Sequence, residues 1–137
     1  MPAVEGCGEG DEGGPAAERE PASVPRVVLP RMPGDNLIRE QTAWDDASRS
    51  WGITQSLDVP ARLALVEKFY RKALASQGFE PRGGALPEDE DGAERAMLRA
   101  RLPHRHVQVS FRQPRGQLTT RVRVIWRIWS TITPENG

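Results

Sequence analysis

The chain has little lysine, one cysteine and no long apolar run, and each of these shortages limits what the protein can be. Among its 137 residues Lys68 and Lys72 are the only lysines, against 17 arginines. A GC-rich genome produces the same skew, so the number of arginines alone assigns no function. The one cysteine, Cys7, excludes an internal disulfide. No apolar run approaches the ~18 residues of a membrane-spanning helix.

Motifs of catalytic, cofactor and metal sites are also missing. No nucleophile has a neighbouring base, and no serine lies in a nucleophile elbow. Three glycines within residues 8–13 match G-x-G-x-x-G, but no strand precedes them and no helix follows. The acidic run 88–91 fails the EF-hand template, because Pro87 and Leu98 fall at two ligand positions. The sequence therefore predicts no cofactor and favours a protein that is not an enzyme.

The formal net charge of zero conceals an uneven distribution along the chain. Residues 1–25 carry six acids against one arginine, so residues 26–137 have a net charge of +5. The first segment also holds five glycines, four prolines and no aromatic residue, and it cannot bury enough apolar surface to offset the entropy of ordering. We expect residues 1–25 to be a disordered acidic tail and residues 26–134 to be a single domain.

The start of the domain predicts an extended segment followed by two strands. Pro33 and Gly34 suit the two central positions of a type II turn, since glycine adopts the positive φ that the second position needs. Strands are expected over 36–44 and 51–57, and apolar residues recur at period two in the second of them. The polar segment between the two strands predicts a turn.

A helix is expected next, with signals at both ends. Asp58 is the predicted N-cap, and Pro60 falls in the first turn, where its missing N–H costs nothing. Gly78 fits the position just past the C-terminus, and Phe79 can fold back onto the last turn. The helical repeat places one set of residues on a buried face: Leu63, Val66, Tyr70, Ala73 and Leu74, with Phe69 at its border.

The last third predicts three strands, over 95–102, 105–112 and 118–129, after a loop over 80–92. Their apolar residues alternate and must meet the helix. We therefore expect an α+β domain of order ββαβββ, with an antiparallel sheet and one helix packed on one face.

The same alternation predicts a basic outer face. With Val109 opposite Val122 every inward residue meets an inward residue, and a slip of one residue would bury arginine. In this register Arg121 lies opposite Ser110 and Arg123 opposite Gln108. The same argument for the preceding hairpin sets Arg99 opposite Ser110 and Arg101 opposite Gln108, so opposed like charges are avoided. The residues expected on the outward face are Arg99, Arg101, Arg121, Arg123, Arg127 and Trp129.

Two interpretations of that face remain open. Solvated arginines discourage aggregation of a sheet, which needs no ligand. Alternatively, two basic rows over a polar floor bind a polyanion, with Trp129 stacking on a base or a sugar. His104 and His106 form a weak metal candidate, because H-x-H turns both imidazoles to one side of a strand, but zinc needs further ligands and none is obvious.

The stretch from Leu29 to Phe79 resembles small, uncharacterised bacterial α+β domains that are often found in extracytoplasmic lipoproteins. A P-x-x-PG opening and a helix ending in FY-x-x-x-L-x-x-x-G-[WF] carry the resemblance: Pro30, Pro33, Gly34, Phe69, Tyr70, Leu74, Gly78 and Phe79. The resemblance implies one helix, five strands and a tether at a lipoprotein cysteine, and it brings no activity that could be transferred.

Cys7 is the residue that such a tether would use. It follows a glycine and precedes a flexible acidic stretch, as at the start of a mature lipoprotein, but the upstream residues MPAVE form no basic and apolar signal. Either a signal is encoded upstream of Met1, or Cys7 is incidental and the protein is cytoplasmic. We expect a small non-enzymatic binding or structural module at the cell envelope, with ligand and partners unknown, and polyanion binding as the alternative.

Overall fold

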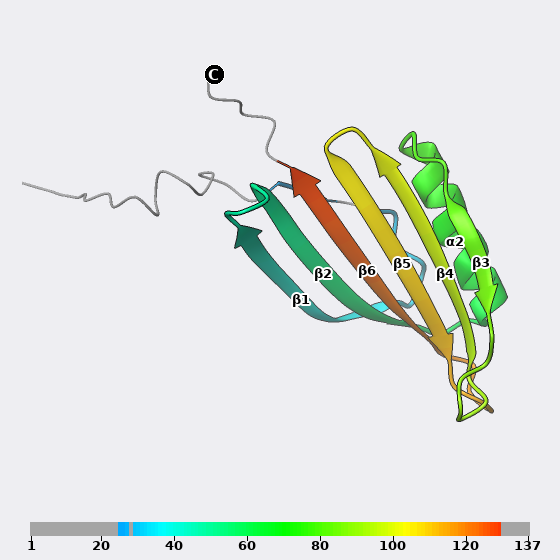
Figure 1. Cartoon of the computed structure of the whole chain (residues 1–137). Coiled ribbons are helices and arrows are strands. Elements are labelled where there is room, and N and C mark those ends of the chain that lie inside the picture. Colours follow the sequence, from blue (N-terminus) through cyan, green and yellow to red (C-terminus); the bar gives the residue numbers. More distant parts are fainter. Residues whose placement is uncertain (1–24, 28, 130–137) are drawn as a thin grey trace, which may run out of the picture.

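A computed structural model describes residues 25–27 and 29–129, so all of the expected tail except Pro25 lies outside the described residues, as do residues 130–134 of the expected domain. The strands form an antiparallel sheet in the order β1-β2-β6-β5-β4-β3 (Figure 1). The elements are β1 (Asn36–Asp45), β2 (Ser50–Val59), α2 (Leu63–Ser76), β3 (Arg82–Leu86), β4 (Glu94–Leu102), β5 (Arg105–Gln113) and β6 (Thr120–Trp129).

The sheet has six strands in the described residues, one more than the order ββαβββ predicts. The additional strand, β3, lies within the segment 80–92, where a loop is expected from the sequence, and it pairs with β4. The sequence does not predict this strand, because it contains two adjacent glycines and glycine is depleted in strands. Gly83 has a φ of +120°, and a Cβ there would lie 2.1 Å from the carbonyl oxygen of Met97, so β3 can approach β4 this closely only with glycine.

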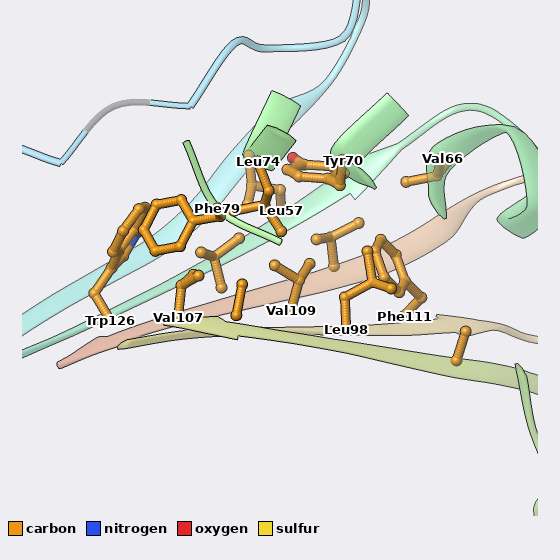
Figure 2. Packing of buried hydrophobic residues seen from close by; sticks show 14 of the residues in the cluster. Leu57, Val66, Tyr70, Leu74, Phe79, Leu98, Val107, Val109, Phe111 and Trp126 are labelled. Atoms are coloured by element: carbon orange, nitrogen blue, oxygen red, sulfur yellow. The ribbon is translucent and has the colours of Figure 1, made fainter. Parts of the chain in front are cut away.

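Helix α2 packs on the part of the sheet formed by β4 and β5, and its five predicted core residues are all buried (Figure 1). The Tyr70 ring meets Phe111 of β5 edge-on, with the ring centroids 5.8 Å apart. Figure 2 shows how the inward side chains of the strands complete this core. The predicted inward face of the last three strands is confirmed: Ala96, Leu98, Ala100, Val107, Val109, Phe111, Val122, Val124, Trp126 and Ile128 are buried, and Leu102 is half-buried.

The extended segment before β1 also packs against the core. The predicted type II turn is present in it, since Gly34 has a φ of +79° and the Asp35 N–H donates to the Met32 carbonyl at 3.1 Å. This segment covers part of the core with three partly buried side chains: Val27, Leu29 and Met32.

The C-terminal end of α2 is as predicted. Gly78 has a φ of +91° and its N–H donates to the Ala75 carbonyl at 3.0 Å, while the Phe79 N–H donates to the Leu74 carbonyl at 3.1 Å. Together these two bonds form a Schellman motif. The Phe79 ring then enters the core and meets Trp126 edge-on, with centroids 6.0 Å apart.

The N-terminal end of α2 differs from the prediction. Asp58 is not the N-cap, because it belongs to β2, and the residue at the N-cap position, Arg62, makes no side-chain cap. The Leu63 N–H donates instead to Oε1 of Gln113, 2.8 Å away at the end of β5. A side chain from another element can accept an unpaired N–H of the first helical turn, as a local cap does. No local sequence pattern reveals such a cap.

Replacing Gln113 with alanine should lower the free energy of unfolding by about 1 kcal/mol, the usual cost of losing an N-cap. Gln113 also donates from Nε2 to the Gln117 carbonyl at 2.6 Å, so the β5–β6 turn should loosen as well. Urea denaturation measures the loss. Gln117→Ala is the matched control, because its backbone carbonyl is kept and its exposed side chain is removed. Equal stability of the Gln113 variant and the wild type would contradict the role of this cap.

Candidate functional site

The face of the sheet opposite α2, called the outer face below, is formed by every second residue of the strands. The inward neighbours of these residues are buried all along β6 and in the middle of β4 and β5. Between the basic side chains, β5 contributes His106, Gln108 and Ser110. All six residues expected on the outer face from the sequence lie on it: Arg99, Arg101, Arg121, Arg123, Arg127 and Trp129.

The pairing register, however, differs from the predicted one by two residues in both hairpins. Val109 lies opposite Val124 rather than Val122. In the preceding hairpin Arg99 lies opposite Gln108, because a two-residue turn at Pro103 and His104 joins β4 to β5. A shift of two residues keeps every side chain on its face, so the alternation argument cannot detect it.

The shift means that opposed like charges are not avoided, contrary to the prediction. Arg112 of β5 lies between Arg95 of β4 and Arg121 of β6 in one row across the outer face. Acids from elsewhere in the chain compensate. Arg121 donates from Nε to Asp58 of β2 at 2.5 Å, and Arg112 donates from Nε to Asp89 at 2.8 Å. Arg112 and Arg121 of this row are therefore compensated, whereas Arg95 donates from Nε to the Pro87 carbonyl at 3.0 Å and has no acidic partner in the described part.

Asp89 anchors the acidic loop between β3 and β4 to the outer face. Its Oδ1 accepts the N–H groups of Asp91 at 2.9 Å and Ala93 at 3.0 Å, while Oδ2 accepts Arg112. The hydrogen bond from Arg112, followed by that from the Ala93 N–H, lowers the pKa of the Asp89 carboxyl below its ordinary value. The loop that resembles a calcium site in its acidity instead pairs with an arginine.

This anchor should weaken in acid. Because folding lowers the pKa of Asp89, its contribution to stability is full above the unfolded-state value of about 3.9 and is lost as the pH falls through the lower folded-state value. Thermal unfolding of the wild type and of Asp89→Asn should differ at neutral pH and converge below about pH 4. Asp91→Asn is the control, since that side chain is 85% exposed and 3.5 Å from Arg112. A difference that stayed constant down to acidic pH would contradict the anchor.

On β4 and β6, three further arginines of the outer face have no acidic partner among the described residues. Arg99 and Arg101 of β4 and Arg123 of β6 are exposed and form no ion pair there. The charge of Arg127 is partly compensated, because its side chain lies 3.8 Å from Asp45. It also donates from Nη1 to Ser50 Oγ at 2.9 Å. Arg99 and Arg101 thus lie toward the end of the face away from Asp58 and Asp89, whereas Arg123 is the next outward residue of β6 after Arg121.

A hollow of the outer face is lined by Arg99 and Arg101 but not by Arg123. It extends from β3 to β6, and its rim includes Arg82, which lies opposite Arg99. Arg82 was not predicted as a site residue, because the sequence signal for β3 is so weak. Its nearest acid is Glu80 at 3.6 Å, and both side chains are at least 80% exposed, so this pair neutralises little. The hollow is lined by Arg82, Arg99, Arg101, Arg127, Gln108 and Ile125 among others.

The two histidines do not lie as the H-x-H pattern predicts. His104 is in the β4–β5 turn, with a φ of +67°, and only His106 belongs to a strand. The His106 ring contacts Trp129 edge-on, with centroids 4.6 Å apart, and Arg101 and Arg127 flank it across the sheet. No group of three metal-ligating side chains occurs within residues 25–27 and 29–129.

Cys7, the candidate for lipidation, lies outside the described residues. Among the helices of the described part, none is long and apolar enough to span a membrane. No protein-family model, curated protein or solved structure matches the chain.

Proposed function

We propose that the domain is a non-enzymatic binding module whose outer face holds an anionic polymer. The observation that supports this most directly is the contrast between two sets of arginines on one surface. Arg112 and Arg121 are compensated by acids from distant parts of the chain, whereas Arg99, Arg101 and Arg123 have no acidic partner in the described part. The charge of Arg112 and Arg121 is used within the chain, whereas the charge of Arg99, Arg101 and Arg123 stays available to a ligand.

The spacing of the free guanidinium groups suits an extended ligand better than a small one. Arg99 and Arg101 are two residues apart on β4, about 6.7 Å along the strand, and Arg123 lies beyond β5 on β6. Each guanidinium group can donate two parallel hydrogen bonds to a phosphate, sulfate or carboxylate. A polymer that repeats such groups reaches several arginines at once.

The floor of the face favours recognition of charge over recognition of bases. Between the arginines of β4 and β6, the strand β5 presents Gln108 and Ser110, which are polar and small or flexible. Trp129 is the one large aromatic side chain that β4, β5 and β6 turn outward within their described ranges. Sheets that read RNA bases carry clustered aromatics. We therefore expect little sequence preference, with stacking limited to Trp129.

Retention on heparin, and anisotropy of a labelled single-stranded oligonucleotide, test this function. The affinity should fall as salt rises, with a slope of log K against log salt near −2, since three phosphate contacts contribute about −0.7 each. Oligonucleotides of different sequence should bind alike. If neither heparin nor oligonucleotide binds at low ionic strength, the proposed function is wrong and the arginines serve solubility.

Association with the cell envelope is a separate proposal that rests on the resemblance to lipoprotein domains and on Cys7. Its test is the genomic sequence upstream of Met1. An in-frame basic and apolar segment that ends next to Cys7 would support a lipid tether. An in-frame stop codon directly upstream would remove it, without affecting the proposal for the outer face.

A further inference from the structure

Within the described residues, strand β1 leaves one of its edges unpaired. It forms one end of the sheet and pairs only with β2 among the described elements (Figure 1). Nine of its ten residues are exposed, so solvent reaches both faces of the strand as well as its free edge. A long edge strand in this state offers a row of N–H and C=O groups to another strand.

The opposite edge of the sheet is protected, which makes the open edge at β1 notable. Strand β3 has only five residues, lies between Pro81 and Pro87, and contains Gly83, whose carbonyl accepts a hydrogen bond from Arg71 at 3.2 Å. Short length and neighbouring prolines are common protections of a sheet edge. Strand β1 contains no proline, and its one irregularity is a bulge between Leu37 and Arg39. Residues 39–45 therefore form a regular free edge.

We propose that two copies of this chain pair through β1, antiparallel about a twofold axis at Thr42. An antiparallel pair must place residues of the same face opposite each other, so the axis falls on a residue position. An axis at Thr42 pairs residues 39–45 of one copy with 45–39 of the other, which is the whole regular edge. The bulge lies just outside this window, whereas an axis nearer the start of β1 would include it.

Charge complementarity selects the same axis. Arg39 and Asp45 both lie on the outer face, as their pairing with Ser56 and Ser50 of β2 shows. With the axis at Thr42, Arg39 lies opposite the partner's Asp45, and this pair occurs twice by symmetry. An axis at Glu40 would place two glutamates face to face, which destabilises a sheet. Arg39 has no ion pair among the described residues, so it is available to the partner.

The pairing would join two sheets edge to edge and continue the outer face across both copies. The inference does not depend on the anionic ligand, because the surface involved is the edge of β1, although Arg127 of the hollow lies 3.8 Å from Asp45. A dimer would nevertheless present two hollows on one extended face, which suits a long polymer.

Light scattering and sedimentation of the protein without ligand, over a dilution series, test the dimer. The wild type should approach twice the 15.2 kDa mass of one chain at high concentration. Because Thr42 lies opposite itself, Thr42→Lys and Thr42→Asp should each weaken dimerisation about tenfold or more through like-charge repulsion. Mixing the two variants should restore a dimer, since lysine then meets aspartate.

Two controls keep the result specific to this register. Gln41→Asp changes the charge equally one position away, where the proposed axis puts the partner's Ala43 opposite, so it should weaken the dimer much less than Thr42→Asp. Thermal unfolding of each variant shows whether the monomer is folded, and Arg39→Asp provides a second repulsive variant, facing the partner's Asp45. A wild type that is monomeric throughout, a dimer insensitive to Thr42, or two variants that fail to combine would each overturn the proposal.

Discussion

Replacing Arg99, Arg101 and Arg123 together with glutamine should weaken binding of heparin or an oligonucleotide about 100- to 1000-fold at low ionic strength. Each charge-assisted hydrogen bond to a phosphate or sulfate contributes roughly 1.5 kcal/mol, or about tenfold in affinity, and the three side chains are removed at once. Glutamine keeps most of the side-chain length and the fold, because all three residues are exposed on the outer face. The remaining binding should also lose most of its salt dependence.

Arg112→Gln with Arg121→Gln is the matched control for this variant. These two arginines lie on the same face but already bind Asp89 and Asp58, so their removal should change the affinity less than about threefold. Equal loss in both variants would show that the net charge of the face matters and that the free region does not. A triple variant that bound like the wild type would refute the proposed function.

Replacing Trp126 with alanine should lower the free energy of unfolding by about 4 kcal/mol, a large share of the 5–15 kcal/mol that stabilises a domain. Trp126 is 1% exposed in the central strand β6, between Ile53 of β2 and Val107 of β5, and its ring meets Phe79. The cavity would lie where the sheet and the segment after α2 meet. Urea denaturation followed by circular dichroism measures the change.

Trp126→Phe should cost far less, about 1 kcal/mol, although it also removes part of a buried ring. The indole Nε1 of Trp126 is buried and has no hydrogen-bond partner in the described part, so the native state already bears the cost of an unmade hydrogen bond. Phenylalanine removes that donor while keeping most of the apolar contact. Losses of similar size for alanine and phenylalanine would mean that the N–H does find a partner, such as a buried water.

The apolar alternation of the last three strands and the helical repeat of 63–74 were enough to predict the two sides of the sheet and the buried face of α2. Both patterns are local, and burial enforces them directly. Strand β3 was not predicted, because Gly83 and Gly84 contribute no apolar alternation. The two-residue register shift was not predicted either, because it depends on turn geometry, which hydrophobic alternation does not constrain.

For the candidate site, too, local patterns were predictable and long-range pairing was not. The sequence placed six residues on one face correctly, since each strand's alternation decides that face. It could not distinguish the compensated arginines from the free ones, because Asp58 reaches Arg121 only through the pairing of β2 with β6. Asp89 likewise reaches Arg112 from a loop 23 positions earlier. Long-range pairing sets the electrostatics of the face, and a single sequence contains little information about it.

The position of β6 in the sheet has a consequence for synthesis. The last described strand, β6, lies between β2 and β5, and no other described strand bridges the hairpin β1–β2 and the meander β3–β5 (Figure 1). During synthesis the two parts therefore cannot join into one sheet until β6 has been translated. Until then, nascent chains should wait with an open edge on β2 and another on β5.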